Sequence, residues 1–94
     1  MHLDPRRRLR LGSDHVATSI GSETAVMSIM RGRYYAMGDV AEEIWLMLET
    51  PVSPDEIAER LVAAYDVTPE VCRTQVNAFL ERLVEEGLVV EAAA

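Results

Sequence analysis

The spacing of apolar residues changes once along this chain, near residue 38, and that change most constrains the fold. Before it, apolar and polar residues alternate over 15–20, 23–30 and 33–37, a pattern typical of half-buried β-strands. After it, apolar residues recur every three or four positions, as in amphipathic helices. Strands followed by helices predict an α+β or winged-helix arrangement within one domain.

The turn between the second and third expected strands sets a register for their pairing. With Arg31 and Gly32 as a two-residue loop, Met30 faces Arg33 across the hairpin. Side chains then divide between two faces, and a slip of one residue would exchange them. The face expected to point into the core carries Met27, Ile29, Tyr34 and Ala36, and the other carries Ser28, Tyr35 and Met37.

Two of the three expected helices begin at clear signals. Asp39 is positioned to cap the first, with Glu42 three residues later in a box-like arrangement. The second has a complete start, because Ser53 is the expected N-cap, Pro54 takes the first helical position and Glu56 completes a capping box. We therefore expect helices to begin close to residues 39 and 54.

The third expected helix starts with Thr68 as N-cap and Pro69 at its first position. Its apolar spacing continues for about four turns. Gly87 is a natural helix stop, and residues 88–90 favour a short final strand.

Charge is distributed unevenly along the 94 residues, whose formal net charge is -7. The first ten residues hold four of the nine arginines, and the chain has no lysine. We interpret residues 1–11 as a flexible basic arm, 12–91 as the folded domain and 92–94 as a loose tail. So acidic a domain would repel phosphates, which disfavours nucleic acid as its ligand and favours a peptide or protein partner.

Groups that could perform catalysis or hold a metal are few and scattered. His2 lies in the expected arm, His15 opens a strand, and neither has metal-ligand spacing to Cys72. Cys72 falls on the apolar side of the third helix, where a small buried side chain is the ordinary interpretation. We therefore expect no enzyme activity and no cofactor. The single cysteine and the absence of a long apolar run favour a cytoplasmic protein without a membrane span.

The strand 33–37 is the most informative candidate for binding. If it lies at a sheet edge, its free N–H and C=O groups could pair with an extended peptide. Arg73 and Gln75, near the start of the third helix, would then be polar partners for that peptide. Trp45 is most simply explained as a core anchor.

Five short motifs, taken in order, resemble the PqqD-like family of precursor-peptide recognition elements. The likeness covers about residues 15–90, and within the family it is strongest to the stand-alone B1 proteins of lasso-peptide biosynthesis. The motifs are Gly32-Arg33-Tyr34-Tyr35, Ala41-x-x-Ile44-Trp45-x-x-Leu48, Glu56-Ile57-Ala58-x-x-Leu61, Tyr65-Asp66-Val67 and Val76-x-x-Phe79-Leu80-x-x-Leu83-x-x-x-Gly87-Leu88.

The resemblance implies a three-stranded antiparallel sheet packed on a three-helix, winged-helix-like bundle. It implies that a leader peptide, commonly with a Tyr-x-x-Pro element, adds as a strand beside 33–37. The protein would pass it to a B2-type leader peptidase and through it to an ATP-dependent cyclase, acting as a monomer or weak dimer. The peptide-binding residues expected on this basis are Arg33, Tyr34, Tyr35, Ala36, Met37, Cys72, Arg73, Gln75, Val76 and Phe79.

Two departures from the family pattern affect these expectations. Met37-Gly38-Asp39 replaces the frequent Leu-Asn after the third strand, and Gln75-Val76 replaces Asp-Val in the third helix, which puts the role of Gln75 in doubt. Two alternatives stay open: a winged-helix DNA-binding regulator and a PqqD-type peptide chaperone in quinone-cofactor synthesis. The first would need a basic recognition helix, whereas the segment 69–86 is predominantly acidic.

Overall fold

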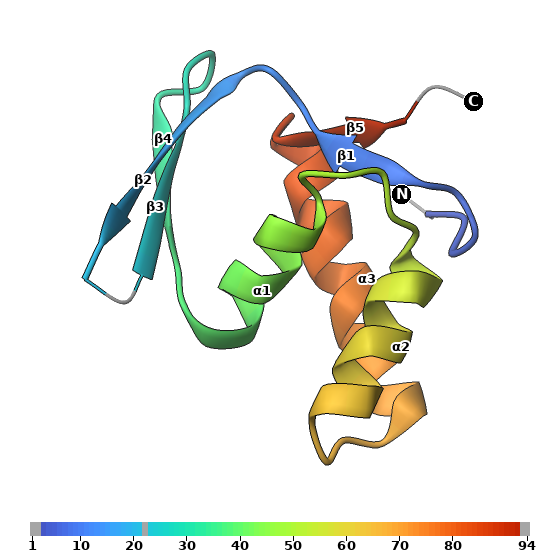
Figure 1. Ribbon diagram of the computed structural model, residues 1–94. Coiled ribbons are helices and arrows are strands. Elements are labelled where there is room, and N and C mark those ends of the chain that lie inside the picture. Colours follow the sequence, from blue (N-terminus) through green and yellow to red (C-terminus); the bar gives the residue numbers. More distant parts are fainter. Residues whose placement is uncertain (1–2, 22, 93–94) are drawn as a thin grey trace.

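The computed structural model describes residues 3–21 and 23–92, and it places one sheet beside three helices (Figure 1). Three antiparallel strands form the sheet in the order β2–β3–β4. The bounds are β2 His15–Ile20, β3 Glu23–Ser28, β4 Arg33–Met37, α1 Asp39–Met47, α2 Pro54–Ala64 and α3 Pro69–Glu85. The expected α+β fold, with a three-stranded sheet and three helices, is confirmed.

A second, two-stranded sheet closes the other side of the helices. It pairs β1, Leu9–Leu11, with β5, Val89–Glu91, antiparallel. The expected final strand is therefore present, one residue later than its pattern indicated. Residues 9–11, which the sequence analysis placed in the flexible arm, are here part of the folded structure, because Leu9 is only 2% exposed and joins the core cluster.

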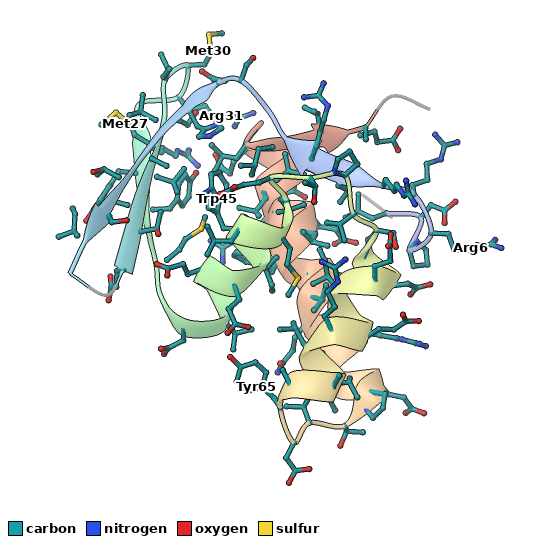
Figure 2. The ribbon with its side chains drawn as sticks, in the orientation of Figure 1. Arg6, Met27, Met30, Arg31, Trp45 and Tyr65 are labelled. Atoms are coloured by element: carbon teal, nitrogen blue, oxygen red, sulfur yellow. The ribbon has the colours of Figure 1, made fainter. Side chains whose placement is uncertain are left out.

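The core lies between the three-stranded sheet, α1 and the α2–α3 pair. Trp45 is 3% exposed and packs edge-on against His15, with 5.1 Å between ring centroids, so its expected role as a core anchor is confirmed. Figure 2 shows Trp45 in the interior, whereas Met27 projects from the outer face of the sheet and Met30 from the hairpin loop at its end. The cluster also includes Val26 and Met37 from the sheet.

The predicted hairpin register is wrong by two residues. Met27 pairs with Tyr34 and Ser28 with Arg33, so the loop holds four residues, 29–32, instead of two. Gly32, at φ +63°, ends the loop and donates its N–H to the Ser28 carbonyl at 2.9 Å. The Asp14 carboxylate, which accepts from the Met30 N–H at 3.0 Å, holds this wider loop.

The predicted core face of the hairpin is also wrong. A shift of two keeps the same residues together on each face, but it is the other face that is buried: Val26 and Ser28 are 0% exposed and Met37 is 3% exposed. Met27 and Tyr34 stand on the exposed face at 49% and 64%. Both faces carry enough apolar residues to form a core face. The way in which the sheet packs on α1 decides which of them is buried.

Among the helix starts, the expected cap at Asp39 is wrong. Gly38 is the N-cap of α1, no side chain caps it, and Asp39 is the first helical residue at φ +50°. Glu42 accepts instead from the Thr24 hydroxyl at 2.7 Å, so it ties α1 to β3. The Ser53–Glu56 capping box of α2 is confirmed, with both bonds at 3.1 Å.

Candidate functional site

The outer edge of β4 has no partner strand among the described residues. β4 is the last strand in the order β2–β3–β4, and β1 and β5 pair with each other elsewhere. In an antiparallel sheet, every second residue of an edge strand turns its N–H and C=O outward, away from the neighbouring strand. Those groups of β4 are therefore available to a further strand.

A hollow of about 200 Å³ lies beside this edge, between β4, α1 and α3. We call it the strand hollow. Its walls are mainly apolar, and the charged side chains in its lining come only from the C-terminal end of α3, which we call the α3 end of the hollow. It is lined by Tyr35, Ala36, Met37, Ala41, Phe79, Arg82, Leu83 and Glu86.

A second hollow of about 330 Å³, the helix hollow, opens between α1, α2 and α3. Ala41 and Phe79 line both hollows, so the two are adjacent, and we call them together the groove. No charged residue lines the helix hollow. Its lining consists of Val40, Ala41, Ile44, Leu61, Tyr65, Val67, Val71, Cys72, Gln75, Val76 and Phe79.

The mouth of the helix hollow exposes apolar side chains to water. Val67 is 43% exposed and Val71 is 52% exposed. Tyr65, labelled in Figure 2 near the end of α2, donates its hydroxyl to the Glu43 carboxylate at 2.7 Å. That hydrogen bond raises the pKa of Tyr65. A concave apolar surface with a few polar groups is the usual form of a site for apolar side chains.

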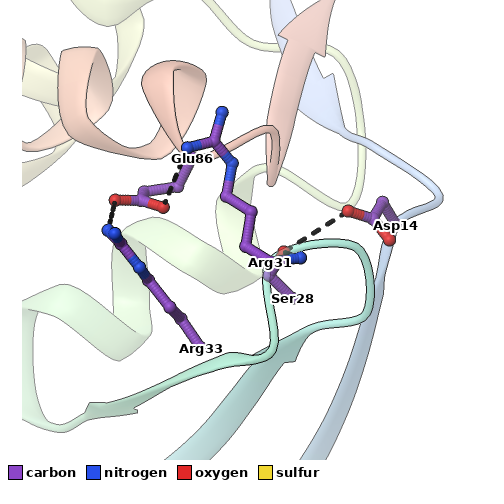
Figure 3. A network of polar contacts seen from close by, with 5 residues as sticks. All are labelled: Asp14, Ser28, Arg31, Arg33 and Glu86. Carbon is purple, nitrogen blue, oxygen red and sulfur yellow. Dashed lines mark hydrogen bonds and ion pairs between the residues drawn. The ribbon is translucent and has the colours of Figure 1, made fainter.

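Glu86 joins the α3 end of the strand hollow to the hairpin (Figure 3). Its carboxylate lies 2.9 Å from the Arg33 guanidinium and 3.7 Å from that of Arg31. The neighbouring Tyr35 hydroxyl, and then the two arginines, hold the pKa of Glu86 below its ordinary value. Burial, followed by the Glu86 carboxylate, raises the pKa of Tyr35.

Two buried atoms in this cluster have no hydrogen-bond partner within the described part of the chain. They are the Tyr35 hydroxyl and Glu86 Oε2. Buried polar atoms of native proteins are nearly always paired, with protein or with water. Both residues line the strand hollow, at its polar end.

Seven of the ten residues expected to bind peptide line this groove. They are Tyr35, Ala36, Met37, Cys72, Gln75, Val76 and Phe79. Their role as peptide contacts stays a prediction, but the fold brings strand and helix residues together as expected.

The other three expected residues point elsewhere. Tyr34 stands on the exposed face of the sheet opposite Met27, away from α3. The Arg33 side chain is held by Glu86. Arg73 lines a separate hollow between α2 and α3. Outward-facing backbone groups alternate along β4, so only one of the neighbours Arg33 and Tyr34 turns its N–H and C=O toward an added strand.

Groove residues that the sequence analysis missed come from two sources. Arg82, Leu83 and Glu86 continue the α3 face of Phe79 at helical spacing, so the three-to-four periodicity could have identified them. Val40, Val67 and Val71 come from the ends of helices and from a loop. No local pattern marks those three, because their convergence depends on how α1 packs against α2 and α3.

The described residues contain no group of three or more His, Cys, Asp or Glu side chains placed to hold a metal ion. Cys72 is buried, with its thiol 3.9 Å from the Ala58 carbonyl. Within the same residues, no helix is both long and apolar enough to cross a membrane.

Comparisons with known proteins agree with this geometry. The sequence model described as "Coenzyme PQQ synthesis protein D (PqqD)" matches residues 23–89. No curated protein gives a significant match.

Two solved structures share the fold. "TbiB1 in Complex with the TbiA(beta) Leader Peptide" has a TM-score of 0.78 and 25% identity, over 90% of this chain and 99% of that one. "Lasso peptide synthetase B1 complexed with the leader peptide" has a TM-score of 0.77 and 22% identity, over 87% and 96%.

Proposed function

This chain belongs to the PqqD family, and from that premise we propose that it binds the leader of a precursor peptide in lasso-peptide biosynthesis. The leader pairs with the outer edge of β4 as an added strand. Support comes from the fold shared with two proteins whose structures contain a leader peptide, one of them a lasso peptide synthetase B1. The Tyr-x-x-Pro element expected for such leaders has a candidate position in the helix hollow.

One observation carries this proposal: an open strand edge lies directly beside an apolar groove. Main-chain hydrogen bonds along β4 would give affinity for almost any extended peptide. Side chains of the added strand alternate between the two faces of the sheet, so every second one turns toward α3. Those side chains enter the strand hollow, where Phe79 and Leu83 select apolar groups.

The protein acts as a non-catalytic adaptor in the cytoplasm. Binding holds the leader in an extended conformation. A processing enzyme that then binds the same segment loses less conformational entropy in ordering it. The partners that would receive the bound precursor are a leader peptidase of the B2 type and, through it, an ATP-dependent cyclase. The adaptor works as a monomer or weak dimer, without nucleic acid or membrane.

The test is a calorimetric titration with the leader peptide encoded beside this gene. We expect binding at micromolar concentration or tighter with one peptide per chain. Phe79→Ala should weaken binding about tenfold or more, because it removes the wall shared by both hollows. Arg73→Ala, on the same helix but outside the groove, is the matched control and should bind as the wild type does.

Thermal unfolding of both variants separates a binding defect from a folding defect, since Phe79 also packs against the core. A wild-type chain that showed no binding at micromolar concentrations would refute the adaptor proposal. Equal losses for Phe79→Ala and Arg73→Ala would refute the position of the groove.

Membership of the PqqD family favours one second candidate, a peptide chaperone in quinone-cofactor synthesis. That function would use the same strand edge with a different peptide. Titration of the chain with both kinds of precursor distinguishes the two: the adaptor proposal expects the lasso leader to bind more tightly.

A further inference from the structure

Charge along the candidate groove is not uniform, and its Arg33 end is positive. Arg31 and Arg33 both approach Glu86, at 3.7 and 2.9 Å, while Arg82 lines the strand hollow. Three guanidinium groups therefore lie at this end of the groove, and two of them pair with the Glu86 carboxylate. Asp14 is engaged by the hairpin through the Met30 N–H and the Ser28 hydroxyl.

The Met37 end of the same strand is negative. Glu23 lies beside Gly38, where an added Cβ would be 3.3 Å from its Cγ. Asp39 begins α1, and Glu43 in the same helix accepts from the Tyr65 hydroxyl of the helix hollow at 2.7 Å. Glu42 is hydrogen-bonded to Thr24, the partner of Met37 in the sheet. No arginine lines the helix hollow.

The two ends are far enough apart to act separately. β4 has five residues, which at about 3.3 Å per residue separate its ends by about 13 Å. Screening reduces interactions between exposed charges beyond about 8 Å at physiological ionic strength. A ligand charge at one end therefore interacts mainly with the protein charges at that end.

We propose that this charge gradient determines which peptides bind and in which orientation. The preferred ligand carries basic residues where it passes Glu23, Asp39 and Glu43, and acidic residues where it passes Arg31, Arg33 and Arg82. Backbone pairing alone accepts an extended peptide in many registers and in either direction. The gradient penalises any orientation that brings like charges together. This inference rests on the proposed function, since it assumes that a peptide occupies the β4 edge.

The experiment compares three forms of the leader encoded beside this gene. One is unmodified, one carries Lys-Lys on the N-terminal side and Glu-Glu on the C-terminal side of the segment that pairs with β4, and one carries the same pairs exchanged. The two tailed forms have identical composition and net charge. We expect one charge order to bind at least about fivefold more tightly at low salt, from about two- to fivefold per exposed ion pair. The ratio should shrink toward one at about 0.5 M salt.

Protein variants assign the preference to the groove. Glu23→Gln with Glu43→Gln should reduce the affinity ratio of the two tailed peptides by about half or more. Glu49→Gln with Glu59→Gln changes the net charge equally. Glu59 lines the separate hollow between α2 and α3, so this variant should leave the ratio unchanged. The amides keep similar size, and the amide introduced by Glu43→Gln still has an oxygen to accept from Tyr65.

The outcomes separate this inference from the proposed function. If the unmodified leader binds but the tailed forms bind equally at low salt, the gradient has no role and the inference is overturned. If both double variants reduce the ratio equally, total charge is responsible, which also overturns it. If no form binds, the proposed function fails and the inference fails with it.

Discussion

Leu9→Ala tests whether the N-terminal segment is part of the folded core. Leu9 is 2% exposed, and its backbone exchanges hydrogen bonds with Val52 at 2.7 and 3.0 Å. Alanine keeps those bonds, so the substitution removes only the buried side chain. Deleting a fully buried leucine side chain costs about 3–5 kcal/mol of unfolding free energy, from lost burial and the cavity left behind.

Urea unfolding followed by circular dichroism measures that cost. A domain of this size has a total stability of about 5–14 kcal/mol, so the variant should still fold, with a lower midpoint and an unchanged slope. Its Tm should fall by more than about 12 °C. Leu46→Ala makes the same chemical change at a side chain 52% exposed on α1, and it should shift the free energy by less than about 0.5 kcal/mol.

The reasoning fails if Leu9→Ala stays within about 0.5 kcal/mol of the wild type. Residues 1–11 would then behave as the flexible arm that their charge pattern suggested. A large loss of unfolding free energy in both variants would instead show that the chain is sensitive to any leucine truncation. The loss in Leu9→Ala could then not be attributed to the burial of Leu9.

Three further predictions concern the caps, the charge cluster and the hairpin. Ser53→Ala should cost about 1 kcal/mol in denaturant unfolding, while Thr68→Ala should cost clearly less, because only Ser53 makes a side-chain cap bond; equal costs would contradict the capping assignment. The pKa of Glu86 is lowered in the folded state, so its stabilisation is present above its ordinary pKa of 4.5 and is lost as pH falls through and below that value. The free energy of unfolding should therefore differ less between pH 7 and pH 3 for Glu86→Gln than for the wild type. Glu85→Gln, at an exposed residue, is the control and should keep the wild-type difference in free energy. Gly32→Ala should lower the free energy of unfolding by about 1 kcal/mol, because φ there is +63°, a conformation that strains alanine, while an added Cβ meets no neighbour. An unchanged denaturation midpoint would contradict the left-handed conformation at Gly32.

Local signals predicted the elements of this fold well because their causes are local. The capping box at Ser53 and the proline after it are determined by residues three positions apart, and both appear as expected. Alternation over β4 identified a strand, and three-to-four spacing along α3 identified its buried face. That face supplied Cys72, Val76 and Phe79 to the predicted site, and all three line the groove.

The hairpin shows where local reasoning ends. Arg31 and Gly32 resemble a two-residue turn, but the chain forms a four-residue loop because Asp14, from a distant segment, binds the Met30 N–H. The buried face was likewise assigned wrongly, since Met27 and Met37 are equally suitable core residues by type. At Asp39 the capping pattern was also misleading, because Gly38 takes the N-cap position and no side chain caps α1.

The sequence by itself determined the order of strands and helices, the acidic character of the folded part and the α3 face that borders the groove, because these depend on neighbours in the chain. Only the tertiary structure decided that the β4 edge is left without a partner among the described residues. Pairing of β1 with β5 carries the N-terminal segment to the opposite side of the helices, away from that edge. The same packing brings Val40, Tyr65 and Phe79 around one hollow. Such contacts depend on how whole elements pack, and no short stretch of sequence specifies them.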